Sequence, residues 1–81
     1  MSDPNIERKV SEIIAEQLGI AEDDIALDST LSGDLGADTL DFIELLMALE
    51  EEFEIEIGDD VASRLETVGN LVEHVARQSS S

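Results

Sequence analysis

One hydroxyl group in this sequence stands where a phosphate group could be attached, that of Thr39. It follows a turn containing Gly36 and begins a segment with helical spacing, residues 39–53. Unpaired N–H groups and the positive end of the helix dipole lie at a helix start, so they would stabilise a phosphodiester bonded to this oxygen. The plainer interpretation is an ordinary capping or solvent-exposed threonine, and Thr39 considered alone does not overcome it.

The helix that positions Thr39 is predicted by its own first residues. Asp38 is suited to be the N-cap, and Asp41 stands at the third helical position, where it can complete a capping box. At about 100° per residue, one narrow arc of this helix is apolar and forms the predicted core face. The residues of that arc are Phe42, Leu46, Leu49 and Phe53.

A second apolar arc on the same helix is bordered by carboxylates. Exposed apolar residues with a charged rim usually mark an interaction surface, and methionine suits a surface that accepts several partners. Ile43 could equally widen the core face. The members of this arc are Leu40, Ile43 and Met47, and the acids beside it are Glu44, Glu50 and Glu51.

A first helix is predicted from Pro4 to about Leu18. Asp3 can be its N-cap, and proline is favoured at the first helical position. Apolar residues then recur at helical spacing. Gly19 can end the helix in the left-handed region of backbone space.

The connection over residues 19–37 shows no regular period. A loop of this length in a small domain is often functional, and its scattered apolar residues predict that it packs against the domain. Residues 22–25 can form a single helical turn. Farther along, Asp59 or Asp60 can cap a short third helix that ends at about Leu65.

The last predicted helix begins after Thr67, which is suited to cap it. The sum is an all-α fold, a four-helix bundle of three longer helices and one short helix, with a long loop between helices one and two. We expect one domain over residues 1–81, ordered over about residues 3–77, with residues 78–81 as a flexible tail.

Net charge is the extreme property of the composition. Against 21 Asp and Glu the chain has four Lys and Arg, which gives a formal net charge of −17. Nucleic acid and anionic membranes are therefore improbable partners, whereas basic protein surfaces would be attracted electrostatically. The chain has no cysteine, no apolar leader and no run that could span a bilayer, so a cytoplasmic monomer is expected.

The residues do not form a recognisable active site. The one histidine, His74, lies far along the chain, and no motif joins it to a serine nucleophile and an acid. Residues 34–38 lack the spacing of a calcium-binding loop, and no other metal motif is present. A binding or carrier protein is therefore predicted rather than an enzyme.

The sequence resembles the bacterial acyl carrier proteins of dissociated (type II) fatty acid synthases. The similarity extends from about Ile6 to Val75, and its segments occur in the same order with this length and charge. The segments are AEQLG at 15–19, DLGAD at 34–38, ELLMALEEEF at 44–53 and TVG at 67–69.

The resemblance implies a carrier that holds acyl intermediates as thioesters on a 4′-phosphopantetheine arm and presents them to fatty acid synthesis enzymes. In that family a phosphopantetheinyl transferase attaches the arm to the serine of an Asp-Ser-Leu motif, which matches Asp38, Thr39 and Leu40. The second helix of the family contacts partners. The implied contacts are Leu40, Asp41, Ile43, Glu44, Met47, Glu50 and Glu51.

The departure from the family lies at the attachment position, because threonine stands where the family has serine. Threonine keeps the oxygen but adds a methyl group, so the alcohol is more hindered and stiffer about χ1. The chain could be a natural carrier with a tolerant transferase, an engineered variant, or a paralogue that has lost the arm and acts only as an acidic interaction module. A mimic of nucleic acid would explain the charge but neither the helix start nor the apolar arc.

Overall fold

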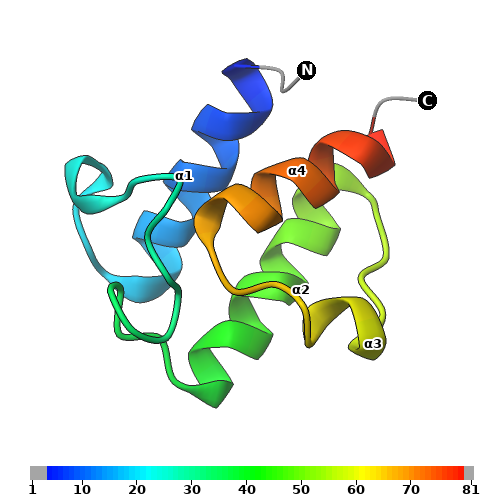
Figure 1. Ribbon diagram of the computed structural model, residues 1–81. Coiled ribbons are helices and arrows are strands. Elements are labelled where there is room, and N and C mark those ends of the chain that lie inside the picture. Colours follow the sequence, from blue (N-terminus) through cyan, green and yellow to red (C-terminus); the bar gives the residue numbers. More distant parts are fainter. Residues whose placement is uncertain (1–3, 80–81) are drawn as a thin grey trace.

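The computed structural model describes residues 4–79 of the chain, which form a bundle of helices (Figure 1). Over this range the structure has four α-helices, one 3-10 turn and no strand, which confirms the predicted all-α fold. The elements are α1 (Pro4–Leu18), η1 (Glu22–Asp24), α2 (Thr39–Phe53), α3 (Asp59–Ala62) and α4 (Val68–Ser79).

Local sequence signals set the ends of the two longest helices. Gly19 has a φ of 67°, which allows it to end α1 in the predicted left-handed conformation. Helix α2 begins after Asp38 and ends at Phe53, both as predicted. Glu54 then adopts the left-handed conformation, with φ 54° and ψ 51°, although it has a Cβ atom that disfavours this region. The expected N-cap of α1, Asp3, lies outside the described residues.

The short helix α3 differs from its prediction at both ends. Asp59 and Asp60 lie inside its first turn, and the N-cap position is held by Gly58, which makes no side-chain bond. The helix ends at Ala62 rather than at Leu65. The reason is a change of hydrogen bonding, because the N–H of Leu65 bonds to the carbonyl of Ala62, three residues back, and tightens the chain into a turn.

Helix α4 has the predicted cap. The hydroxyl of Thr67 accepts a hydrogen bond of 3.1 Å from the N–H of Asn70, and Asn70 Oδ1 accepts one of 3.1 Å from the N–H of Thr67. The helix continues through Gln78 to Ser79, two residues that the sequence assigned to the tail, while residues 80–81 of that tail lie outside the described part of the chain.

The core is aliphatic and lies where α1 packs against α2 and α4, which also contact each other. Leu45 of α2 is fully buried, so its omission from the predicted core face was wrong, whereas Phe42 and Phe53 are only half-buried at the margin. The buried residues are Val10, Ile14, Leu31, Ala37, Leu45, Leu46, Leu49, Val68, Leu71, Val72 and Val75.

An ion pair links α1 to α2 at the surface. Lys9 Nζ lies 2.8 Å from Glu52 Oε2, and this hydrogen bond raises the pKa of Lys9 above its ordinary value. The residues that it joins are far apart in the sequence, so the contact reflects the packing of the two helices.

The loop between α1 and α2 is fixed to the start of α4, which confirms that it packs against the domain. The N–H of Leu31 donates to the carbonyl of Glu66 over 2.9 Å, and the N–H of Gly69 donates to the carbonyl of Leu27 over 2.8 Å. A Cβ atom at Gly69 would lie 3.0 Å from that Leu27 carbonyl oxygen, so glycine permits this close approach. The loop therefore holds the start of α2 against the far end of the chain.

Candidate functional site

Thr39 is exposed at the first position of α2. The turn before it is closed by a capping box, as predicted. Asp38 Oδ1 accepts a hydrogen bond of 2.8 Å from the N–H of Asp41, and Asp41 Oδ2 accepts one of 3.3 Å from the N–H of Asp38. The hydroxyl of Thr39 makes no hydrogen bond with the residues at 4–79, so it is free to react or to bind.

The loop that leads to Thr39 has a defined shape. Thr30 and Asp34 exchange two hydrogen bonds, from the N–H of Thr30 to Asp34 Oδ2 over 3.0 Å and from the N–H of Asp34 to Thr30 Oγ1 over 2.9 Å. Gly36 turns the chain with a φ of 72°, and Ala37 is buried, with its N–H bonded to the carbonyl of Leu31 over 2.8 Å. Thr39 therefore follows a fixed segment rather than a free loop.

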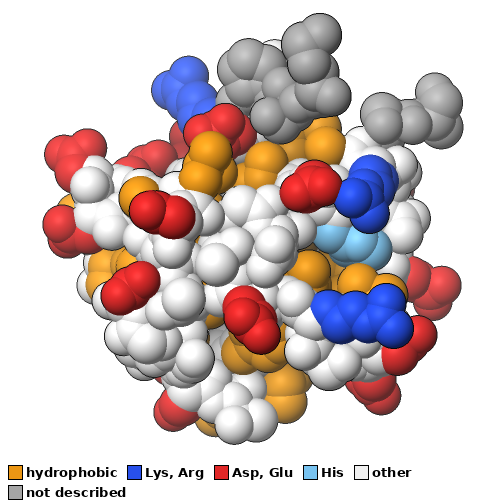
Figure 2. All heavy atoms as spheres, in the orientation of Figure 1, with side chains coloured by type: hydrophobic (Ala, Val, Ile, Leu, Met, Phe, Trp, Pro, Cys, Tyr) orange, Lys and Arg blue, Asp and Glu red, His pale blue; other side chains and the backbone are white. Residues whose placement is uncertain are grey.

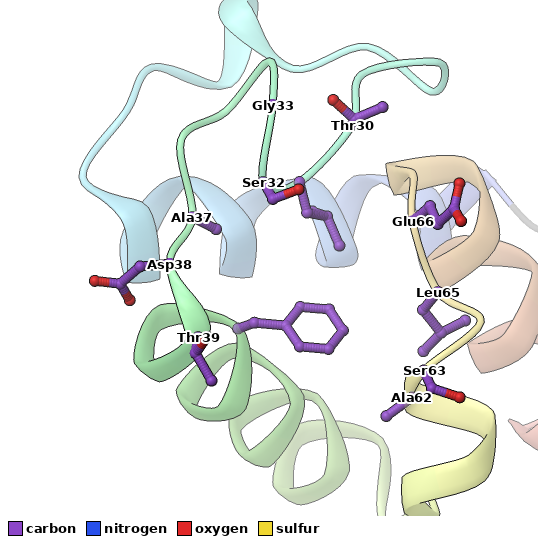
Figure 3. A pocket seen from close by; sticks show the side chains of 12 residues that line it. Thr30, Ser32, Gly33, Ala37, Asp38, Thr39, Ala62, Ser63, Leu65 and Glu66 are labelled. Carbon is purple, nitrogen blue, oxygen red and sulfur yellow. The ribbon is translucent and has the colours of Figure 1, made fainter.

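A cavity of about 670 Å³ lies beside Thr39. Figure 3 shows Thr39 at the start of α2 on one side of it and Ala62 and Leu65, from the end of α3 and the segment after it, on the other side. The carboxylate of Asp38 points away from that segment, on the outer side of the turn. Apolar side chains that also line the cavity include Leu31, Ala37 and Phe42.

The sequence did not identify this cavity. Phe42 was assigned to the core face, and Leu65 was assigned to the end of a helix. The cavity arises because the segment at 62–66 lies opposite the loop at 30–39, two regions that no sequence motif connects. The structure shows one sign of the cavity in a single residue, because the large apolar side chain of Phe42 is only half-buried.

The second apolar arc of α2 is exposed, as the helical spacing predicted. The exposed fraction is 63% for Leu40, 48% for Ile43 and 55% for Met47. Ile43 therefore lies with the exposed arc and does not widen the core. Glu44 and Glu51 are also exposed, and neither makes an ion pair or hydrogen bond within residues 4–79.

Two of the acids assigned to the same surface have bonds inside the domain. Asp41 is half-buried and belongs to the capping box. Glu50 is also half-buried, and its Oε2 atom accepts a hydrogen bond of 2.7 Å from the N–H of Ile57 in the segment between α2 and α3. The carboxylates that face solvent without a partner on this helix surface are therefore those of Glu44 and Glu51.

The structure offers neither a metal centre nor a membrane-spanning helix in the part of the chain that it describes. Within residues 4–79 no group of three or more His, Cys, Asp or Glu side chains is placed to hold a metal ion. No helix over those residues combines the length and apolar character needed to cross a bilayer.

Comparisons with known proteins agree on one family. Residues 8–75 match the family described as "Phosphopantetheine attachment site". An acyl carrier protein of Clostridium perfringens (strain SM101 / Type A) is 51% identical over 71 residues, which cover 88% of this chain and 93% of the relative. The acyl carrier protein of a second strain, strain 13 / Type A, has the same identity and coverage.

Solved structures show the same fold at lower identity. The solution structure of a candidate acyl carrier protein from Anaplasma phagocytophilum is 33% identical, with a TM-score of 0.89, and the match covers 100% of this chain and 94% of that one. The acyl carrier protein of Enterococcus faecalis is also 33% identical, with a TM-score of 0.80, and the match covers 98% of this chain and 100% of that one.

Proposed function

The chain belongs to the acyl carrier protein family with a phosphopantetheine attachment site, and we propose that its 4′-phosphopantetheine arm is attached to the side-chain oxygen of Thr39. The protein is a carrier of acyl groups in fatty acid synthesis and not an enzyme. The arm supplies a thiol on which acyl groups are held as thioesters. The observation that carries the assignment to Thr39 is its exposed, unpaired hydroxyl at the start of α2.

The surroundings of Thr39 fit a phosphodiester. Asp38 occupies one of the free N–H groups at the helix start, and the others remain for a bound phosphate oxygen. The helix has 15 residues, long enough for its dipole to favour a negative group at this end, by about 0.3–1 kcal/mol at an exposed site. Because the loop before Thr39 is already ordered, little further conformational entropy is lost when a transferase positions this oxygen for reaction.

The methyl group of Thr39 sets the expected rate. It lies on the carbon that bears the reacting oxygen, so it must fit beside the incoming phosphorus in a transferase whose pocket serves serine in this family. A small misplacement of the reacting atoms is costly in such transfers. We expect Thr39 to be modified, but more slowly than serine at the same position.

Intact mass spectrometry tests the assignment. The chain is incubated with coenzyme A and a phosphopantetheinyl transferase, beside Thr39→Ser and Thr39→Val, the second of which keeps the branched shape and lacks the oxygen. We expect a mass gain in the unmodified sequence, a faster gain in Thr39→Ser and none in Thr39→Val.

The same experiment decides the alternative function. If Thr39→Ser is loaded and the unmodified chain is not, the protein has lost the arm and acts as an acidic interaction module. If Thr39→Val gains mass, the attachment residue lies elsewhere in the chain. Circular dichroism of the variants verifies that each one is folded.

The exposed arc of α2 is the surface on which partners dock. Family membership implies contact with fatty acid synthesis enzymes, and the charge of −17 favours basic surfaces on them and on the transferase. The apolar centre of the arc can be buried against a partner while the acids at its edge pair with Lys or Arg. The residues of this docking surface are Leu40, Ile43, Glu44, Met47 and Glu51, with Asp41 and Glu50 beside them.

A charge reversal tests the docking surface. Glu44→Lys removes an attraction and adds a repulsion, each of about 0.2–1 kcal/mol for an exposed pair, so we expect affinity for the transferase to fall by about two- to thirtyfold at low salt. Glu16→Lys makes the same charge change on an exposed residue of α1. Equal losses in the two variants, measured by calorimetry, would show that total charge rather than this surface determines binding.

The cavity beside Thr39 is the site where an attached acyl chain is sheltered. Its lining contains Phe42 and Leu65, and it opens beside the attachment residue. An acyl chain in this space removes apolar surface from water at about 25 cal/mol per Å². In an acylated form we expect nuclear Overhauser contacts from the acyl chain to Leu65, and an acyl chain that contacts only solvent would refute this role.

A cytoplasmic location stays a prediction from the sequence.

A further inference from the structure

A second cavity, of about 410 Å³, lies between α3 and α4, and basic side chains, which are scarce in this acidic chain, line it. Its lining includes Arg64 and Arg77, two of the four Lys and Arg residues, together with the only histidine, His74. Figure 2 shows the pale blue histidine side chain between two blue side chains on the face that α3 and α4 form. The cavity is separate from the one beside Thr39, although Leu65 borders both.

Arg64 stands out by the absence of a partner. Arg8, Lys9 and Arg77 each pair with a carboxylate in the described part of the chain, at 3.5, 2.8 and 2.8 Å. Arg64 makes no side-chain hydrogen bond or ion pair with residues 4–79, in a chain with 21 Asp and Glu. Its five N–H donors are therefore free for a ligand.

The ring of His74 has a second unpaired group. Its Nε2 atom is buried and has no hydrogen-bond partner among the described residues. Buried polar atoms in proteins are nearly always hydrogen-bonded, so this atom is expected to bond to a water molecule or a ligand. With a proton on Nε2, this atom is a donor.

Asn70 adds a donor whose direction is fixed. Its Oδ1 atom accepts hydrogen bonds of 3.1 Å from the N–H groups of both Glu66 and Thr67. The amide oxygen is thus committed to the cap of α4, and its Nδ2 group has no partner within residues 4–79. The one carboxylate of the lining, Glu73, is already bonded to Arg77 over 2.8 Å.

We propose that Arg64, Asn70, His74 and Arg77 form a binding site for a phosphate group. The side chains of Arg64 and Arg77 and the Nδ2 group of Asn70 supply only donors, and the set therefore favours an oxyanion as the ligand. A phosphate group, with more oxygens and more charge than a carboxylate, uses donors from four directions better. Val61 and Leu65 also line the cavity, which suits the apolar part of a phosphate monoester.

The probes are inorganic phosphate, phenyl phosphate and benzoate, each titrated into the full chain at constant ionic strength. Two-dimensional NMR follows the Arg64 Nε–H group, the Asn70 side-chain amide and the His74 ring. We expect saturable shifts at these groups with inorganic phosphate. Tighter binding of phenyl phosphate identifies an organic monoester as the natural ligand, and equal binding identifies free phosphate.

A matched pair of variants separates the site from the general charge. Arg64→Gln removes the free guanidinium, and we expect it to weaken phosphate binding by about tenfold or more, because the charge-assisted hydrogen bonds of Arg64 to the ligand are lost. Arg8→Gln makes the same charge change on α1, where Arg8 is paired with Glu12, and should leave the affinity unchanged.

Three results would overturn the proposal. Shifts that rise linearly with concentration or spread over the whole chain indicate no site. Equal loss of affinity in Arg64→Gln and Arg8→Gln indicates binding by overall charge. Benzoate binding as tight as that of phenyl phosphate indicates a carboxylate site. None of these readouts involves Thr39 or the arm, so this proposal and the proposed function can fail separately.

Discussion

The acids of α2 divide into two classes, and the neighbouring residues Glu50 and Glu51 provide the test. Glu50 accepts a hydrogen bond of 2.7 Å from the N–H of Ile57 and is half-buried, whereas Glu51 is exposed and has no partner within the described residues. Glu50→Ala should therefore destabilise the fold, and Glu51→Ala should not. Both variants remove one negative charge from the same helix.

The magnitude follows from the geometry of the bond. A hydrogen bond to a charged group contributes about 1.5–3 kcal/mol, and the N–H of Ile57 would lose its acceptor in a partly buried place. In a domain of this size, 1 kcal/mol shifts the midpoint of unfolding by about 4–8 °C. We expect Tm to fall by about 6–24 °C in Glu50→Ala relative to Glu51→Ala.

Thermal unfolding followed by circular dichroism at fixed ionic strength measures this difference. Glu51→Ala is the reference because it has the same gain from reduced charge repulsion and the same change in helix propensity. Amide hydrogen exchange at Ile57 gives a local measure and should accelerate only in Glu50→Ala. Equal midpoints for the two variants, or unchanged exchange at Ile57, would refute the division of the acids.

Three further outcomes are expected from thermal unfolding. Gly69→Ala should lower the free energy of unfolding by about 1 kcal/mol. Overpacking against the Leu27 carbonyl costs about 1–3 kcal/mol, and the higher helix propensity of alanine offsets about 1 kcal/mol of that cost. An unchanged Tm would contradict the close approach. Glu54→Gly should raise stability by about 0.5–1 kcal/mol, because glycine adopts φ 54° without strain, and a lower Tm would contradict this. Added NaCl should raise Tm by screening the net charge of −17, and a lower Tm in salt would argue against self-repulsion.

Elements whose signals are local were predicted well from the sequence. The capping box of Asp38 and Asp41 and the helix end at Gly19 depend on residues within one turn, so their types and spacing suffice. The exposed arc of Leu40 and Met47 follows from helical geometry in the same way. The hydroxyl of Thr39 at the start of α2 could therefore be located before any coordinates were known.

Features that depend on packing between distant segments were missed. A helical wheel shows which side chains share a face but not which neighbours approach that face, so Leu45 was left out of the core that α1 and α4 complete. The bond from Ile57 to Glu50 comes from a segment, residues 54–57, whose polar–apolar alternation is too short to predict its structure or contacts. The cavity beside Thr39 likewise requires the pairing of Leu31 with Glu66, which no local pattern specifies.

The backbone hydrogen bond between Leu31 and Glu66 lies at one end of a stretch that is held to the domain by few buried side chains. Residues 58–65 lie between that bond and the Glu50–Ile57 bond, and α3 contains no buried residue. An outward movement of this stretch would expose the partly buried Ala62 and Leu65 but no fully buried side chain of α3, while the loop before residue 39 would stay bonded to the start of α4. On the proposed function, a longer acyl chain could then enter the cavity of about 670 Å³ without a shift of residue 39, its proposed attachment point.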